Sequence, residues 1–432
     1  MYRSWRQTCL RLNTAFGLAY IVAGLTGCGE QLEPSGVSGG GPSEQSPFPA
    51  PLAAVYVGCP AGAVRMATSD NWATKVNAAA AGTVFCVASG THLNANSVVP
   101  KSGMQFIAAT QRGATLDGRN TQQYAFQTLR ATPSNVVIRG LVIRNYATPA
   151  PHGTIQGDNG AGWIIEDNEV AYNNYMGVRP GRNTIVRRNY IHHNRLSGIS
   201  CYRCDGARIE YNTLTHNPPV PVTQTAQNSS AAQIKIVATV NVTVRQNQLS
   251  DGQHKGIWFD FGNRGVKIDT NTIVRHGLTG IWQEQGFDAK IRGNTITACA
   301  IRTSGFDPTW IDGAGIQMTN SPNVEIAYNT ISDCLNGVGI MSVSGYPSSG
   351  AERNYVADLY VHHNTVTMAT GRTGIQQSAG TDSVFTHWNN HFTANTYNTG
   401  TAARAAFAWL DGNRTFTQWQ GYGHDLSGVA SP

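Results

Sequence analysis

An asparagine that recurs at intervals of 21 to 35 residues constrains the fold of this chain more than any other feature. Each copy has Ile or Val three residues before it and Ile, Leu or Val two residues after it. Such a period is typical of solenoids, in which each unit buries its apolar side chains only by stacking on its neighbour. The asparagines are Asn168, Asn189, Asn212, Asn247, Asn271, Asn294, Asn329 and Asn364.

A second motif, Gly followed by Ile or Val, falls between the asparagine motifs. Short β-branched runs bounded by turn residues predict strands, so each unit contains short strands, a Gly turn and an Asn turn. Stacked asparagines can also pass side-chain amide hydrogen bonds from one unit to the next. The glycines are Gly177, Gly198, Gly256, Gly280, Gly315 and Gly374.

These motifs resemble the right-handed parallel β-helix superfamily that includes pectate lyases, over roughly Tyr56 to Trp409. The resemblance implies an all-β, single-stranded solenoid, and 47 glycines with only 13% charged residues agree with it. Because an open solenoid exposes strand edges, we expect a cap at each end. The sequence predicts a short N-terminal helix from Trp72 to Ala81 and a C-terminal cap containing Trp409 and Trp419, which we interpret as structural.

The N-terminus has the features of an export signal. Three arginines precede an apolar run, Ala15 to Leu25, which is shorter than the ~20 residues that span a bilayer. The following Leu25-Thr26-Gly27-Cys28 resembles a bacterial lipobox, in which the chain is cut before the cysteine and the cysteine is acylated. The alternative is an ordinary signal with a chance cysteine. We expect a protein exported to the bacterial cell envelope and anchored in a membrane through Cys28.

Four regions follow from these features: a signal peptide at 1–27, a Pro/Gly/Ser tether at 28–54, the β-helix at 55–410, and a C-terminal cap and tail at 411–432. The tether has too few apolar residues to offset its ordering entropy. Three of the 31 basic residues lie in the signal, which leaves 28 against 25 acidic ones. This balance gives no argument for a nucleic-acid partner, and we expect a monomer.

Six cysteines remain after the signal and the lipobox, and an even number in an exported chain predicts disulfides. Cys299 and Cys334 each stand five residues after a repeat asparagine. They therefore occupy the same site on adjacent coils, about 4.8 Å apart, which is within bridging distance. We predict Cys299–Cys334 and, by elimination, Cys59–Cys86 and Cys201–Cys204; zinc at the last pair would need a second ligand pair.

The strand after each Gly-Ile motif is the best place for chemistry. If the Ile points inward, the next residue points outward, and successive coils present these residues in one column. Asp260 and Glu284, each two residues after a tryptophan of this column, face the same way and are expected to lie about 4.8 Å apart. The column consists of Arg179, Ser200, Lys235, Trp258, Trp282, Gln317 and Gln376.

Three roles remain open for Asp260 and Glu284. A separation of about 5 Å suits a retaining glycosidase. Together with Asn263 they could instead hold Ca²⁺, a cation that prefers oxygen ligands. The resemblance implies a third role, because lyases of this fold commonly combine such a calcium with a Lys or Arg base that takes the proton next to a uronate carboxylate. The candidate bases are Lys235, Lys255 and Arg179, and the candidate substrate-binding residues are Trp258, Trp282, Gln317, His254 and His276.

The leading hypothesis is a surface-anchored lyase or epimerase that acts on a uronate-containing polysaccharide, rather than a hydrolase. The alternative is a non-catalytic carbohydrate-binding or cell-surface structural protein, in which the acidic pair is a solvated patch beside structural tryptophans. Convergence of an Asp, Glu and Lys cluster in a groove would favour the enzyme, and a flat outward face would favour the alternative. Three longer coils carry insertions that either build a binding face or are simple surface loops, near Pro218–Ser230, Ile301–Asp312 and Ser342–Ala357.

Overall fold

The computed structural model describes residues 56–219, 231–302, 310–344, 355–368, 370–401 and 404–431. These residues all belong to one compact unit, Pro47–Pro432. The expected signal, Cys28, the tether and most of the three insertions lie outside the described residues. None of the described helices has the length and apolar composition needed to cross a membrane.

The described strands form three long sheets, here called A, B and C, and all strand pairs are parallel except β36 with β37. Sheet A contains β1 (Val64–Met66), β2 (Val84–Val87), β4 (Gln105–Ala108), β7 (Val137–Arg139), β10 (Ile164–Glu166), β13 (Ile185–Arg187), β16 (Arg208–Glu210), β19 (Thr243–Arg245), β22 (Lys267–Asp269), β25 (Lys290–Arg292), β28 (Val324–Ala327), β31 (Leu359–His362) and β34 (His391–Thr393).

Sheet B contains β3 (Gly90–His92), β5 (Ala114–Asp117), β8 (Leu141–Arg144), β11 (Glu169–Ala171), β14 (Tyr190–His192), β17 (Thr213–Thr215), β20 (Gln248–Ser250), β23 (Thr272–His276), β26 (Thr295–Cys299), β29 (Thr330–Ser332), β32 (Thr365–Thr367), β35 (Thr396–Asn398) and β38 (Val429–Ser431). Sheet C contains β6 (Phe126–Gln127), β9 (Gly153–Gln156), β12 (Met176–Arg179), β15 (Ser197–Tyr202), β18 (Ala232–Val237), β21 (Lys255–Phe259), β24 (Ile281–Glu284), β27 (Ala314–Thr319), β30 (Asn336–Ser342), β33 (Thr373–Gln377), β36 (Phe407–Trp409) and β37 (Gly412–Arg414).

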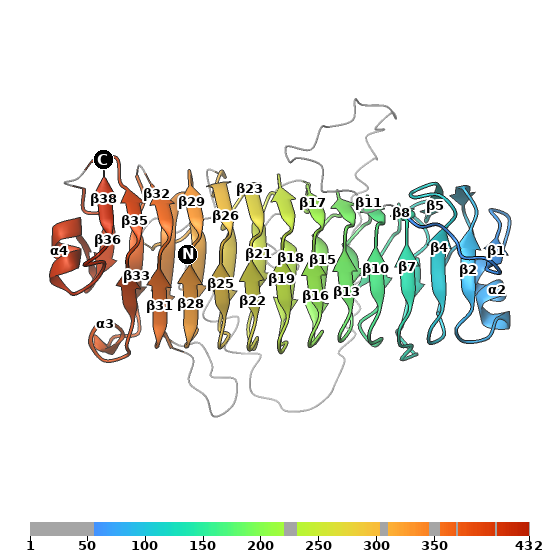
Figure 1. The fold of residues 1–432 in the computed structure, drawn as a ribbon, viewed down its shortest axis with the longest axis horizontal. Coiled ribbons are helices and arrows are strands. Elements are labelled where there is room, and N and C mark those ends of the chain that lie inside the picture. The colour runs from blue at the N-terminus through green and yellow to red at the C-terminus, as the bar shows by residue number, and fades with distance from the viewer. Residues whose placement is uncertain are drawn as a thin grey trace, which may run out of the picture. The chain divides into compact units, whose positions relative to one another are not determined.

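Most coils contribute one strand to each sheet, so the chain is a right-handed parallel β-helix, as the repeat predicted. Figure 1 shows the strands following one another in chain order along the solenoid. The inward positions carry aliphatic side chains that stack from coil to coil. Ile257, Ile281 and Ile316 are one such run in sheet C, and each is fully buried.

Helices close both ends of the coil stack (Figure 1). At the first end α2 (Trp72–Ala78) begins at Asn71, whose side chain accepts a hydrogen bond from the Thr74 amide. The helix ends three residues earlier than predicted, because Ala79 already has extended backbone. At the other end lie α3 (Ser383–Thr386) and α4 (Phe416–Gly421). Trp409 and Trp419 are buried there against each other, in the structural role expected.

The repeat asparagines form a continuous hydrogen-bonded ladder through the interior. Each one donates from its backbone amide and from Nδ2 to Oδ1 of the next, for example from Asn168 to Asn189 at 3.0 Å in both cases. The ladder continues past Asn364 to Asn395 and ends on Asp425, which the repeat motif did not identify. A stacked amide satisfies buried backbone and side-chain groups that would otherwise lack partners.

The three expected disulfides are present. Their Cα–Cα distances are 5.4 Å for Cys59–Cys86, 5.9 Å for Cys201–Cys204 and 4.6 Å for Cys299–Cys334. The last bridge confirms the register deduced from the asparagine repeat, since its two cysteines lie on adjacent coils two residues beyond the pair of Thr297 with Ser332.

The outward column of sheet C differs from the prediction at its C-terminal end. Gln317 pairs with Gly339 and Gly339 with Gly374, so Gln376 does not continue the column of Gln317. Instead Gln376 pairs with Met341, in line with Thr319 and Glu284. The cause lies in β30, which contains two consecutive Gly-aliphatic pairs. The pairing is therefore shifted by two residues relative to the pairing that a single Gly-Ile motif implies.

Candidate functional site

Six side chains converge on the outer face of sheet C, and all come from three successive strands or their ends. Register places Lys235 beside Trp258, and Trp258 beside Trp282. Asp260 directly follows β21, one residue beyond the pair of Phe259 with Gln283, which places it in line with Glu284. We call the six residues the lysine–carboxylate cluster: Lys235, Lys255, Trp258, Asp260, Trp282 and Glu284.

The two tryptophans form the centre of this cluster. Their rings stack with centroids 5.3 Å apart and an interplanar angle of 9°. Both ammonium groups lie on Trp258, with Lys235 Nζ 3.6 Å and Lys255 Nζ 3.7 Å from its ring centroid. Trp258 was predicted to bind substrate. Its ring is instead covered by its neighbours, so it is not available to stack on a sugar. Only Trp282 is partly exposed, and its Nε1 donates to Thr319 Oγ1 at 3.1 Å.

The charged groups are paired in two different ways. Lys235 Nζ lies 3.0 Å from Asp260 Oδ2, an ion pair that is partly exposed on its Asp260 side. Glu284 is only 7% exposed, and its Oε2 accepts a hydrogen bond from Trp258 Nε1 at 3.0 Å. Lys255, also 7% exposed, interacts electrostatically with both Glu284 and Lys235. The cluster thus combines a formed ion pair with a buried amine and a buried carboxyl.

Burial moves the pKa values of the buried pair toward each other. It raises the pKa of Glu284 to about 7, and the negative charge of Asp260 adds to that shift. It lowers the pKa of Lys255 to about 7, and the positive charge of Lys235 adds to that shift. Burial therefore favours the uncharged carboxylic acid of Glu284 and the uncharged amine of Lys255, the forms in which one group can give a proton and the other can take one.

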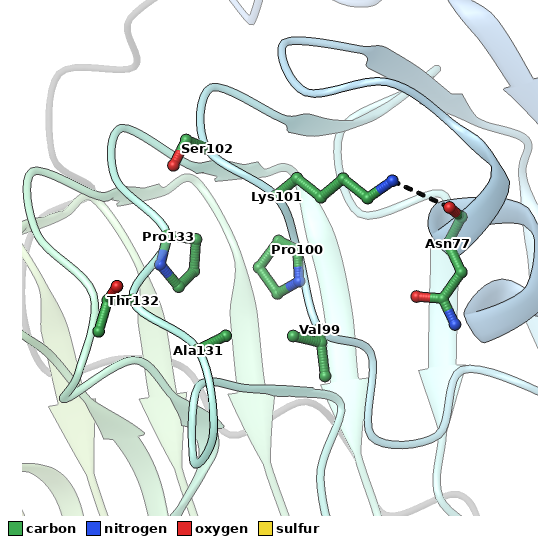
Figure 2. A pocket seen from close by; sticks show the side chains of 8 residues that line it. All are labelled: Asn77, Val99, Pro100, Lys101, Ser102, Ala131, Thr132 and Pro133. Atoms are coloured by element: carbon green, nitrogen blue, oxygen red, sulfur yellow. Dashed lines mark hydrogen bonds between the residues drawn. The ribbon is translucent and has the colours of Figure 1, made fainter.

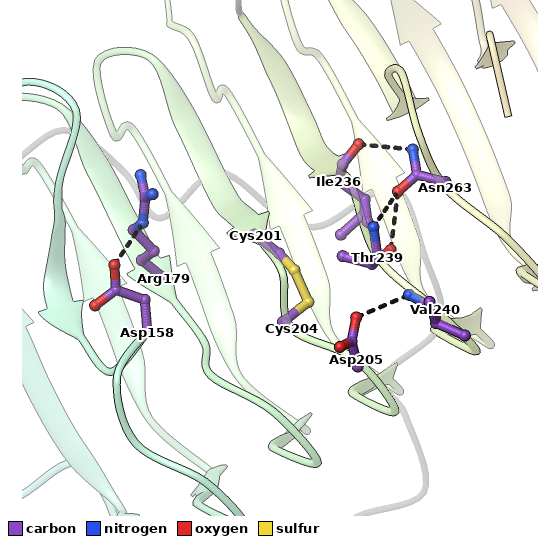
Figure 3. The surroundings of a disulfide bond; sticks show 9 residues. All are labelled: Asp158, Arg179, Cys201, Cys204, Asp205, Ile236, Thr239, Val240 and Asn263. Carbon is purple, nitrogen blue, oxygen red and sulfur yellow. Dashed lines mark hydrogen bonds and ion pairs between the residues drawn. A yellow bond between two sulfur atoms is a disulfide. The ribbon is translucent and has the colours of Figure 1, made fainter. Parts of the chain in front are cut away.

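The predicted calcium ligands do not fit a hard cation. The Oδ1 atom of Asn263 accepts from the backbone N and Oγ1 of Thr239, and its Nδ2 donates to the Ile236 carbonyl (Figure 3). The Nδ2 atom also donates to the backbone carbonyl of Asp260, so the whole amide is used to close a turn. Two ammonium groups in the cluster would also repel a cation. In the described part of the chain, no three His, Cys, Asp or Glu side chains are arranged to hold a metal.

The two histidines that were predicted to bind substrate, His254 and His276, do not lie on the outer face of sheet C. His276 is fully buried, in register with Cys299, and its Nε2 lies 3.2 Å from Gln233 Nε2. The left-handed backbone at Arg275 (φ 54°) breaks the alternation there and turns His276 into the interior. His254 precedes Lys255 and is buried; burial and the Lys255 charge lower its pKa to about 2, so it stays neutral. Both side chains are therefore covered in this arrangement.

Gln317 and Arg179 lie on either side of the cluster. Gln317 follows Trp282 in register and is buried, with its Oε1 accepting from Thr279 Oγ1 at 2.8 Å. Arg179 lies two coils before Lys235, with Ser200 between them. Its Nε is 3.3 Å from Asp158 Oδ2, and Figure 3 shows the two side chains pointing toward each other. Arg179 is therefore not a partner of Asp260 or Glu284.

A second polar group was not found from the sequence. Tyr124 OH lies 2.6 Å from His152 Nδ1, and both residues precede strands of sheet C. Burial, and then the charge of Arg179, lowers the pKa of His152, while burial, and then the charge of Asp158, raises the pKa of Tyr124. We call Tyr124, His152, Asp158 and Arg179 the Arg179 cluster. Of these residues, the sequence pattern indicated only Arg179, through its position in the outward column. Tyr124 and His152 lie in segments outside the repeat motifs.

A hollow of about 360 Å³ near the N-terminal cap is a weaker candidate (Figure 2). Its lining consists mainly of Pro, Val, Ala, Ser and Thr, with one lysine. That lysine, Lys101, donates through Nζ to the backbone carbonyls of Asn77 and Ala79, so it is already used to hold the cap. The hollow therefore lacks the acid–base groups that the outer face of sheet C provides.

Comparison with known proteins identifies the fold. The sequence model described as "Right handed beta helix region" matches residues 84–238 and 232–418. No curated protein sequence matches the chain. Among solved structures, the A-module of mannuronan C-5 epimerase AlgE6 from Azotobacter vinelandii is similar with a TM-score of 0.59 and 16% identity, over 83% of this chain and 93% of that one.

Two further structures have the same architecture. A mannuronic acid specific polysaccharide family 6 lyase from human gut microbiota gives a TM-score of 0.53 at 11% identity, over 83% of this chain and 93% of that chain. The catalytic unit of a GH87 α-1,3-glucanase from Streptomyces thermodiastaticus gives 0.53 at 15% identity, over 88% and 70%. At these identities the similarity establishes the fold, and the chemistry has to be argued from the side chains.

Proposed function

This chain belongs to the right-handed beta helix family, and on that premise we propose that it is a lyase or epimerase acting on a uronate-containing polysaccharide. The observation that carries the proposal is the lysine–carboxylate cluster, in which Lys255 and Glu284 both have a pKa of about 7 beside the Lys235–Asp260 ion pair. Uronate chemistry needs a base for the C5 proton, a cation for the adjacent carboxylate and an acid for the leaving oxygen.

Each requirement has a candidate group. The ammonium of Lys235 pairs with the uronate carboxylate, which makes the C5 proton more acidic. The neutral amine of Lys255 takes that proton, and the electron pair of the C5–H bond forms a C4=C5 double bond. The C4–O bond breaks, and the carboxylic acid of Glu284 gives its proton to the leaving oxygen. Transfer of the new Lys255 proton to Glu284 restores both groups.

An epimerase would use the same first step and omit elimination. After Lys255 removes the C5 proton, the carbanion would take a proton from water on its opposite side, which inverts C5 and leaves the glycosidic bond intact, and the ammonium of Lys255 would return its proton to water. Similarity to an epimerase module and to a polysaccharide lyase supports both outcomes through the fold alone. We further propose that the protein is exported and anchored through Cys28, which would place the site where extracellular polymers are met.

A non-catalytic carbohydrate-binding protein is the second candidate. The low exposure of Lys255, Trp258 and Glu284, each 7%, favours it, because a reacting sugar must reach these groups. A binder needs only the partly exposed edge formed by Asp260 and Trp282. The two functions differ in whether the C5 proton exchanges with solvent.

The test uses the soluble chain without its lipid anchor, incubated in deuterated water with a panel of uronate-containing and neutral polysaccharides. We expect deuterium incorporation at C5, or unsaturated products with ultraviolet absorbance, from a uronate polymer alone. Lys255→Met should reduce either signal at least ~100-fold, and Glu284→Gln should reduce the formation of unsaturated products by the same factor. Lys267→Met, an exposed lysine on sheet A, is the matched control and should retain full activity.

Binding without exchange or elimination by the wild-type chain would favour the non-catalytic candidate. Full activity of Lys255→Met would remove this cluster as the site.

A further inference from the structure

The outer face of sheet C is closed on one side of the lysine–carboxylate cluster. Beyond Gln317 the outward column continues with Gly339 and Gly374. The space above Gly339 is filled, since the Ile311 carbonyl oxygen is 2.5 Å from where a Cβ would stand. Ile311 packs there with Met341, Val343 and Ala408. A ligand at Trp282 therefore cannot extend across this apolar cover in the C-terminal direction.

In the opposite direction the same column leads to the Arg179 cluster. Register continues from Lys235 through Ser200 to Arg179. Two coil steps separate Lys235 from Arg179, which corresponds to about 10 Å. Among the described residues, the polar side chains of this column therefore continue toward the N-terminus.

The side chains of the Arg179 cluster are held in place by an ion pair and hydrogen bonds. Arg179 faces Asp158 through Nε and donates to the Pro151 carbonyl through Nη1. A guanidinium has five N–H donors, so donors remain after these contacts. Tyr124 fixes His152 through Nδ1, and the other ring nitrogen, Nε2, has no hydrogen-bond partner among the described residues.

We propose that the Arg179 cluster is a second sugar-binding site that holds an acidic unit of the same polymer, about 10 Å along sheet C from Lys235. The inference rests on the proposed function, since it assumes that a polysaccharide lies along sheet C. The free donors of Arg179 bind the carboxylate of that unit and His152 Nε2 contacts a hydroxyl. The polymer then runs from Trp282 toward the N-terminal coils, and short oligomers that fill only the first site lose this contact.

The experiment compares size-defined oligomers of a uronate polymer with the wild-type chain and Arg179→Gln. Binding is measured by calorimetry and turnover by the assay above. For Arg179→Gln we expect about a tenfold rise in Kd and KM for long oligomers with kcat unchanged, and no change for the shortest oligomers that bind. Arg208→Gln, an exposed arginine on sheet A, is the control and should match wild type at every length.

The outcomes separate the two proposals. Product formation with an Arg179→Gln profile equal to wild type at all lengths would overturn the second site and leave the proposed function standing. An equal loss at all lengths would also overturn it, because Arg179 would then act on folding or on the first site. Binding and turnover of no polymer by the wild type would overturn both proposals together.

Discussion

Trp258 connects the two charged pairs of the candidate site. Its ring face carries both lysine ammonium groups, and its Nε1 hydrogen bond reaches Glu284. Burial raises the pKa of Glu284, and this hydrogen bond opposes the shift because it stabilises the carboxylate. The indole therefore helps to set the pH at which Glu284 loses its proton.

Trp258→Phe should move the pH–rate limb that belongs to Glu284 upward by about one unit, since phenylalanine has no N–H donor. The matched control is Trp282→Phe, whose indole donates to Thr319 and not to a carboxylate. The pH dependence of kcat/KM measures both variants. Equal shifts in the two variants, or no shift in either, would contradict this role of Trp258.

The raised pKa of Glu284 also predicts how stability depends on pH. The folded chain keeps the Glu284 proton up to about pH 7, whereas the unfolded chain releases it near the ordinary value of 4.5. The folded state therefore binds more protons in this window, and stability falls as pH rises from about 4.5 to 7. In Glu284→Gln this loss is absent, so its melting temperature relative to wild type should rise across that window. A constant difference from pH 4.5 to 7 would show that Glu284 is not buried as a neutral acid.

Among the structural elements, the asparagine ladder depends on how it ends. Asp425 Oδ1 accepts from the backbone amide and Nδ2 of Asn395, each at 2.9 Å. Its Oδ2 accepts from Tyr397 OH and Trp419 Nε1, also at 2.9 Å. A carboxylate is an acceptor only, so it suits the last position of a ladder in which every asparagine donates onward. One side chain thereby joins the ladder to the C-terminal cap.

Asp425→Ala should destabilise the protein by on the order of 3 kcal/mol, because it leaves buried donors without an acceptor. Chemical unfolding would measure this loss. Asp382→Ala, at an exposed position with no side-chain hydrogen bond to its helix, is the control and should change stability little. Equal stability of the two variants would mean that the ladder does not need its terminal acceptor.

For the molecule as a whole, the proposed anchor determines where the site can act. Cys28→Ala should remove acylation and shift the protein from the membrane fraction to the soluble fraction. Fractionation of cells with an antibody to the chain, together with mass spectrometry of the N-terminal peptide, tests both statements. An unchanged membrane fraction would rule out anchoring through Cys28.

The sequence alone determined the coil stack, the register of the repeat asparagines, the Cys299–Cys334 bridge and the alignment of Asp260 with Glu284. These follow from two fixed spacings, the alternation of side chains along a strand and the distance between coils. Both spacings hold wherever the repeat is regular. The predicted column position of Gln376 was wrong, because β30 interrupts that regularity.

Only the tertiary structure decided which of these groups can react and which are structural. It covered Trp258 with two lysines, turned His276 inward, used the Asn263 amide in a turn, and brought Tyr124 to His152. Burial, pKa and free hydrogen-bonding atoms depend on every neighbour in space, including residues from turns that have no repeat. Where the repeat is regular, a period in the sequence fixes where a side chain points, but the groups packed around it determine its chemistry.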